Sequence, residues 1–155
     1  MEPVNKPVYG PSQRGVGLIE VLIAVLVLSI GFLGIAALQA KSLSTNNSAM
    51  ARSMAVVASY SILDAMRADR ANALAGTYNQ TVTADACPAT GSGLVTDQLS
   101  VWCSQLANTL GANATTTGVV NCSSTGDCTV TIQFDDSRSG VGGTSTQQVI
   151  TRAML

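Results

Sequence analysis

One carboxylate lies inside the most apolar part of the chain. Residues 16–38 form an apolar run of 23 residues, and Glu20 is its one ionisable side chain. A charged group inside a membrane-spanning helix costs about 2.5–3.5 kcal/mol on insertion scales, so such groups usually serve a function. Glu20 is therefore expected to pair with a cation, and a free α-amino group formed just upstream would suit. The alternative is that Glu20 lies near the membrane interface, or is protonated.

Four cysteines lie beyond the apolar run: Cys87, Cys103, Cys122 and Cys128. An even number in a small polar domain beyond a membrane segment predicts two disulfides in an oxidising compartment. A zinc site is the competing hypothesis, but zinc ligands usually come in pairs about two to four residues apart. Here 15, 18 and 5 residues intervene. We favour Cys87 with Cys103 and Cys122 with Cys128, although the spacing does not prove this pairing.

The composition argues against catalysis and against nucleic-acid binding. The chain has no histidine, the commonest general base and neutral metal ligand. It has 8 basic and 9 acidic residues, which leave no basic surface for nucleic acid. Asp135 and Asp136 follow a predicted strand and could bind a cation, but a solvated strand end is favoured. No catalytic residue, metal or cofactor is therefore expected.

The apolar run is long enough to cross a membrane. As a helix its residues would span roughly 35 Å, against a hydrocarbon core of about 30 Å. Lys6 and Arg14 precede the run and Lys41 follows it, so the positive-inside rule keeps residues 1–15 in the cytoplasm. The remainder is then exported. This order is the reverse of an ordinary signal peptide, whose apolar region precedes the cleavage site.

The sequence Arg14-Gly15-Val16-Gly17-Leu18-Ile19-Glu20-Val21-Leu22 resembles the prepilin motif of type IV pilins and type II secretion pseudopilins. The resemblance implies that prepilin peptidase cuts after Gly15 and that Val16 becomes the N-methylated N-terminus. It also implies that Glu20 is the assembly carboxylate, pairing with the N-terminal amine of a neighbouring subunit. Val16 replaces the usual phenylalanine and Gly17 the usual threonine.

The following residues, 26–39, resemble the N-terminal helix of minor pilins of the PilV type. Major pilins commonly carry a proline here, whereas this chain has Gly31 and Gly34. The resemblance implies a subunit that helps to prime type IV pilus assembly, in twitching motility and adhesion. Its implied partners are the major pilin, other minor pilins, prepilin peptidase, the inner-membrane assembly platform and a pilus-tip adhesin. Its implied location is the inner membrane as a precursor, with the C-terminal domain in the periplasm, and then the pilus surface of a Gram-negative bacterium.

We expect an α+β, pilin-like fold in which one long helix packs on a small antiparallel sheet stapled by disulfides. Its predicted parts are a leader (1–15), a transmembrane or filament-core helix (16–39), an amphipathic continuation (40–76) and an exported globular domain (77–155). The continuation is expected to carry an amphipathic stripe and to end at Gly76. The stripe consists of Met50, Met54, Val57 and Ser61, flanked by Val56, Tyr60, Leu63 and Met66. A break at residues 44–48 is the alternative, because Ser, Thr and Asn are poor helix formers.

The exported domain is expected to contain a helix over 95–110, with Trp102 as a core anchor and Cys103 on the same face. Alternating apolar residues predict strands at 129–134 and 147–154. Residues 112–118 and 137–145 are expected to form loops.

Three other functions compete with the minor pilin. A type II secretion pseudopilin shares the cleavage motif and the anchor. A membrane-tethered surface binding module would need no cleavage at Gly15 and would leave Glu20 unexplained. An enzyme is disfavoured, since the sequence shows no histidine, nucleophile motif, phosphate-binding loop or metal-ligand spacing.

Overall fold

The computed structural model describes Gly15, residues 17–137 and residues 143–155. The chain divides into two compact units, Met1–Gln39 and Ala40–Leu155, and each is described by itself. The α+β fold is confirmed: it has a long N-terminal apolar helix, a small antiparallel sheet and two disulfides.

Helix α1 covers Leu18–Ala68 and remains helical through residues 44–48, so the predicted alternative of a break there is wrong. Thr45 contributes to this continuity by donating its hydroxyl hydrogen bond to the carbonyl of Lys41. The helix does not reach Gly76 as expected. It ends at Ala68, and a second short helix, α2, covers Arg70–Leu74.

The helix is interrupted at Asp69. Its backbone leaves the helical region, with φ −118° and ψ 50°. Its carboxylate accepts hydrogen bonds from the Asn72 amide, at 2.9 Å, and from the Tyr78 hydroxyl, at 3.1 Å. Gly76, with φ +76°, then turns the chain out of α2.

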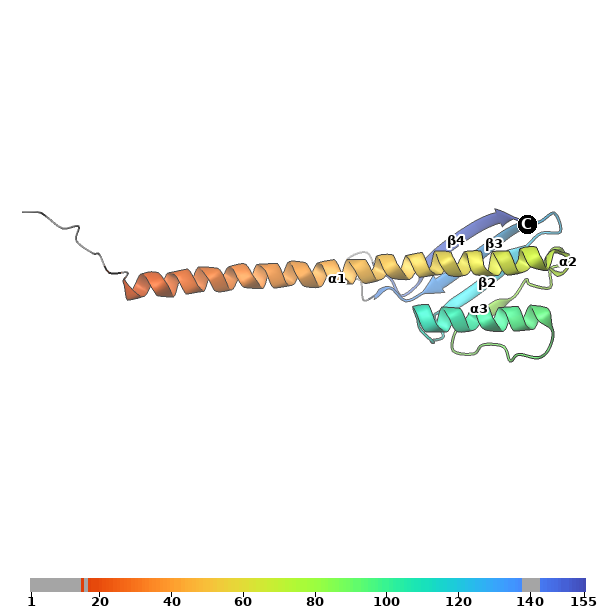
Figure 1. Ribbon diagram of the computed structural model, residues 1–155, viewed down its shortest axis with the longest axis horizontal. Helices are drawn as coiled ribbons and strands as arrows, with labels where there is room; N and C mark the ends of the chain where they lie inside the picture. The colour runs from red at the N-terminus through yellow and green to blue at the C-terminus, as the bar shows by residue number, and fades with distance from the viewer. Residues whose placement is uncertain (1–14, 16, 138–142) are drawn as a thin grey trace, which may run out of the picture. The chain divides into compact units, whose positions relative to one another are not determined.

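The sheet is a four-stranded antiparallel meander in the order β1-β2-β3-β4. Its strands are β1 (Thr81–Thr83), β2 (Thr117–Cys122), β3 (Asp127–Phe134) and β4 (Gln147–Met154). Helix α3 (Leu94–Leu110) lies between β1 and β2 in the chain. We call residues 40–155 the exported unit, after their expected location. Within this unit α3 runs beside the second half of α1 (Figure 1).

The core forms where α1, α3 and one face of the sheet meet. The buried residues of α1 are Ala55, Ala58, Ser59, Ile62, Leu63 and Met66. The predicted stripe was right for its flanking residues Leu63 and Met66, which are buried, and wrong for Met50 and Val57, which are 59% and 56% exposed. Between residues 55 and 59 the buried side chains of α1 are small, whereas the larger Val56 and Val57 are exposed.

Trp102 is the largest anchor of this core, as predicted, and is 2% exposed. Its indole N–H donates a 2.9 Å hydrogen bond to the carbonyl of Ala58, and thereby joins α3 to α1. On its other side the ring lies against Gly118 of β2. A Cβ at position 118 would come within 2.8 Å of Leu106 Cδ1 and still closer to the Trp102 ring. The close approach of helix and sheet therefore requires glycine there.

The cysteines form two disulfides, so the zinc hypothesis is wrong. Cys87 bonds to Cys103 and ties the segment after β1 to α3. Cys122 bonds to Cys128, its cross-strand partner in the β2–β3 hairpin. These are the pairs that we favoured from the sequence. Both disulfides contribute to the core, because three of the four cysteines are almost completely buried and Cys87 packs against it.

Most elements of the exported unit agree with prediction. Helix α3 and strands β3 and β4 occupy the expected places. Strands β1 and β2 were missed, and the predicted loop at 112–118 overlaps the start of β2. The predicted loop at 137–145 falls largely outside the described residues.

Candidate functional site

The start of α1 brings together the residues of the expected processing site. Gly15 and Gly17 lie before the first helical turn and are exposed. Gly17 ends this non-helical segment, since its carbonyl accepts the first helical hydrogen bond, 2.9 Å from the N–H of Glu20. A Cβ added at Gly15 would meet nothing within 4 Å. The chain at Gly15 is therefore sterically open. Val16 and the leader up to Arg14 lie outside the described residues.

Glu20 lies in the first turn of α1, where the positive end of the helix dipole favours an anion. Its side chain is exposed, and no hydrogen bond or ion pair joins it to any other residue that the structure describes. It stands beside an apolar face made by Val21, Ala24, Val25 and Leu28. An acid in such surroundings, with no cation beside it among the described residues, can receive one from another molecule.

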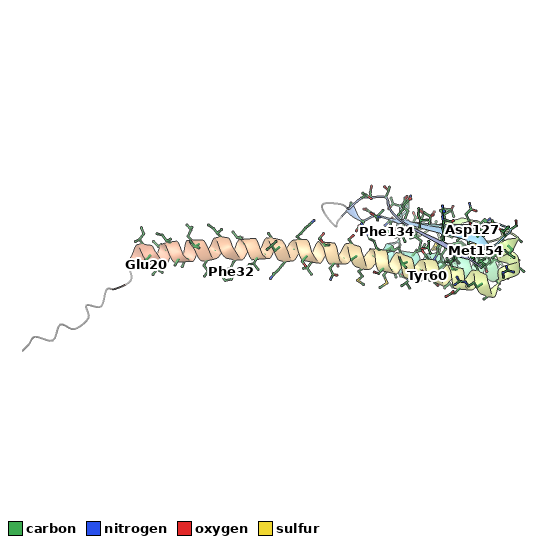
Figure 2. All side chains as sticks on the ribbon, turned by 90° about the horizontal axis from the view of Figure 1, so that it is seen from above. Glu20, Phe32, Tyr60, Asp127, Phe134 and Met154 are labelled. Carbon is green, nitrogen blue, oxygen red and sulfur yellow. A yellow bond between two sulfur atoms is a disulfide. The ribbon has the colours of Figure 1, made fainter. Side chains whose placement is uncertain are left out.

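The first half of α1, residues 18–39, carries its apolar side chains on all sides. Figure 2 shows them standing out from the helix on both sides of the ribbon, with Glu20 and Phe32 labelled. None is buried, and Phe32 is 62% exposed. The most apolar 18-residue window has a mean hydropathy of 2.9, enough by length and composition to cross a membrane. A helix that is apolar all round is suited to lipid or to other apolar helices.

Polar and small residues of this half fit such surroundings. Ser29, which would be unsatisfied in lipid, donates its hydroxyl hydrogen bond to the Val25 carbonyl at 2.7 Å. Helix α1 continues through Gly31 and Gly34. A Cβ at either position would meet nothing within 4 Å. Nothing in the described chain requires glycine at these positions. Any packing role of these glycines would involve another molecule.

The exported unit contains a polar cluster that sequence analysis missed. Asp136, expected to be solvated, is only 6% exposed. It accepts a 2.6 Å hydrogen bond from the Ser48 hydroxyl and lies 3.6 Å from the Arg52 guanidinium. Arg52 also donates to the side chain of Gln147 at the start of β4. The cluster fastens α1 to the segments around β3 and β4. Its only sequence signal was the row of polar residues at 44–48, which looked like a helix break.

A second cluster surrounds Tyr78, which is completely buried. The Tyr78 hydroxyl is close to Gln98 of α3 and donates to Asp69 between α1 and α2. Burial, with the hydrogen bond and negative charge of Asp69, raises the pKa of Tyr78 to about 12. The phenol is thus held neutral as a structural donor, and it links three helices.

A shallow apolar groove of about 230 Å³ lies between α1 and α3. Ile62, Ala65, Val101 and Trp102 form most of its lining. Among the described residues no group of three or more acidic or cysteine side chains could hold a metal ion. The groove brings together no set of groups suited to catalysis.

A comparison with protein-family models finds one match, to the prokaryotic N-terminal methylation motif, over residues 10–36. No curated protein and no solved structure matches the chain. The matched segment contains Gly15, Val16 and Glu20 and most of the apolar half of α1. It supports a type IV prepilin-like protein, a structural class rather than an enzymatic one, whose apolar helix anchors it in a membrane.

Proposed function

We propose that this prepilin-like chain is a minor pilin of the PilV type, a structural subunit that helps to prime or nucleate type IV pilus assembly. The observation that carries the proposal is the first half of α1. It combines the N-terminal methylation motif with an apolar surface that no other described residue covers. Such a helix can leave the membrane only if other apolar helices take the place of the lipid around it, as in the core of a filament.

Cleavage between Gly15 and Val16 is the first step of this proposal. Proteases bind substrates in extended form, and the helix begins only at Leu18. Gly15 also offers no side chain that would obstruct a peptidase. The cut removes Lys6 and Arg14, the cations that hold the leader in the cytoplasm, and leaves Val16 as a new N-terminus.

Glu20 then takes the new amine as its partner. An isolated carboxylate loses its hydration in an apolar filament core, and a paired ammonium group offsets that loss. Glu20 has no competing partner among the described residues. We assign it to the amine of a neighbouring subunit, which makes pairing a condition for leaving the membrane. Processing and assembly are thereby chemically linked.

Substitution of Glu20 tests this step. Glu20→Gln keeps the shape of the side chain and removes its charge, whereas Ser29→Ala is a matched change elsewhere in the same half. Both variants should insert in the membrane and be cleaved as the natural chain is. Recovery of Glu20→Gln in sheared filaments should fall about tenfold or more, as for loss of a buried ion pair. Normal recovery of Glu20→Gln would overturn the pairing.

A type II secretion pseudopilin is the second candidate, because it shares the motif and the anchor. Crosslinking separates the two systems, since every cysteine in the described chain is in a disulfide and a new one would be a unique thiol. Cysteine at Leu33, which is 71% exposed, should crosslink to major or minor pilins. Crosslinks to secretion pseudopilins alone would replace the pilus assignment. An uncleaved, uncrosslinked chain would favour a tethered binding module.

A further inference from the structure

The outer edge of β4 carries an inference that does not depend on the filament proposal. Strand β4 ends the sheet and pairs with β3 alone (Figure 1). No other strand in the described part of the chain covers its second edge. It has 8 residues, longer than the usual strand of about 5–6. The sheet therefore ends in a long row of backbone groups open to another strand.

The register identifies which residues present those groups. The N–H of Leu155 donates to the carbonyl of Gly126 at 3.0 Å, one residue beyond the pair Asp127–Met154. Hydrogen-bonded and non-hydrogen-bonded pairs alternate along an antiparallel ladder. The odd-numbered residues of β4 thus bond to β3. The residues whose N–H and C=O groups point away from β3 are Gln148, Ile150, Arg152 and Met154.

Apart from one charged side chain, Arg152, this edge lacks the features that usually protect a sheet edge. Natural edges are blunted by short strands, by proline, by lysine or by bulges. Strand β4 contains no proline, glycine or lysine, and its pairing with β3 is unbroken. Ile150 and Met154 are 59% and 64% exposed on it. The opposite edge, β1, is only 3 residues long. The sheet protects one edge and leaves the other suited to strand addition.

Arg152 indicates the chemistry of the added strand. It is exposed, and no hydrogen bond or ion pair joins it to another described residue. It is the only charged residue of β4. A second copy of β4 would bring another arginine and no acid, so self-pairing leaves this charge uncompensated. An opposite charge directly across two strands, in contrast, stabilises their pairing.

We propose that the β4 edge binds an extended segment of another protein by β-strand addition, with a carboxylate opposite Arg152 and an apolar side chain opposite Ile150. The added strand makes main-chain hydrogen bonds to the four edge residues. Arg152 and Ile150 fix its register, since a slip of one residue would move the acid to the other face of the sheet.

A synthetic peptide tests the proposal on the full chain in detergent micelles. The probe is an antiparallel peptide of alternating threonine and valine, with glutamate opposite Arg152 and valine opposite Ile150. Its binding should slow amide hydrogen exchange at the four edge residues. One control peptide carries backbone N-methyl groups on the side facing β4 and should not bind. A second carries them on the far side and should bind as the parent does.

Charge reversal provides the matched variants. Arg152→Glu should weaken binding of the glutamate peptide about fivefold, as expected for an exposed ion pair. A peptide with lysine in place of that glutamate should bind Arg152→Glu more tightly than it binds the natural chain. Lys41→Glu in α1 should leave the affinity of both peptides unchanged. The neutral Arg152→Gln serves if the reversed variant folds poorly. Equal binding of both N-methylated peptides, or no binding of the parent, would overturn the proposal. Concentration-dependent protection of the edge without peptide would assign it to a second copy instead.

Discussion

The two halves of α1 belong to one helix but differ in where their apolar side chains find partners. In the second half, residues 40–68, six side chains are buried against the sheet and α3. In the first half, residues 18–39, every large apolar side chain is more than half exposed. The second half is stabilised by packing within the chain, and the first requires lipid or other helices to cover it.

Aromatic truncation should give the largest contrast between the halves. Trp102→Ala removes a buried ring and its hydrogen bond to Ala58, and should lower the unfolding free energy of the exported unit by about 3–5 kcal/mol. Phe32→Ala, in the exposed half, should change it by less than about 0.5 kcal/mol. Chemical denaturation in micelles, followed by tryptophan fluorescence for Phe32→Ala and by circular dichroism for both, measures the difference. Equal effects would mean that the halves are not energetically distinct.

Replacement of glycine by alanine should change stability in opposite directions in the sheet that packs on α1 and in the first half of α1. Gly118→Ala places a methyl group against Trp102 and Leu106, and should destabilise the exported unit by about 1–3 kcal/mol. Gly31→Ala meets no neighbour and should stabilise the isolated helix by up to about 1 kcal/mol. Thermal unfolding checks the first and helix content the second. A tolerated Gly118→Ala would contradict the close approach of α3 to β2.

Two serines of α1 give a smaller contrast. Ser48→Ala removes a hydrogen bond to the buried Asp136 and should cost about 1–2 kcal/mol. Ser29 bonds only to its own helix, so Ser29→Ala should change stability by less than about 0.5 kcal/mol. Denaturant titration of both variants measures this. Identical midpoints would show that the Asp136 cluster does not fasten α1.

Alkaline pH should destabilise the exported unit through Tyr78. The pKa of Tyr78 is raised from 10.0 to about 12, so its contribution to stability is complete below pH 10. That contribution is lost as the pH rises through the folded-state value of about 12. Tyr78→Phe should abolish this part of the pH dependence. The measurement is the thermal midpoint of both proteins as a function of pH from about 10 to 12. An equal pH dependence in the natural chain and in Tyr78→Phe would contradict a neutral Tyr78 phenol.

The contrast between the halves also explains what the sequence could predict. The apolar anchor helix could be predicted because its apolar run, with Glu20 inside it, is a local feature of the sequence. Trp102 and strand β4 were found through periodicity. The buried face of α1 was misassigned in part, because small residues such as Ala55 and Ala58 give a weak pattern beside Met50 and Val57. Their burial is decided by the sheet that packs on them.

The missed polar contacts have a similar origin. Asp136 and Ser48 are separated by 88 residues, so no local pattern links them. Strand β2 was hidden because Gly118 and its threonine neighbours are typical of a loop, and only the ring of Trp102 explains the glycine. The processing site was the easier prediction, since its residues are contiguous and their chemistry does not depend on the fold.

The most direct test of the proposed function is the mass of the chain recovered from assembled filaments, made in cells with their native export machinery. If the exposed half of α1 is a processed filament helix, the chain begins at Val16 and carries one added methyl group at its N-terminus. Both disulfides should also be present in the same molecule. A chain in assembled filaments that still carries its leader through Gly15 would contradict the proposal.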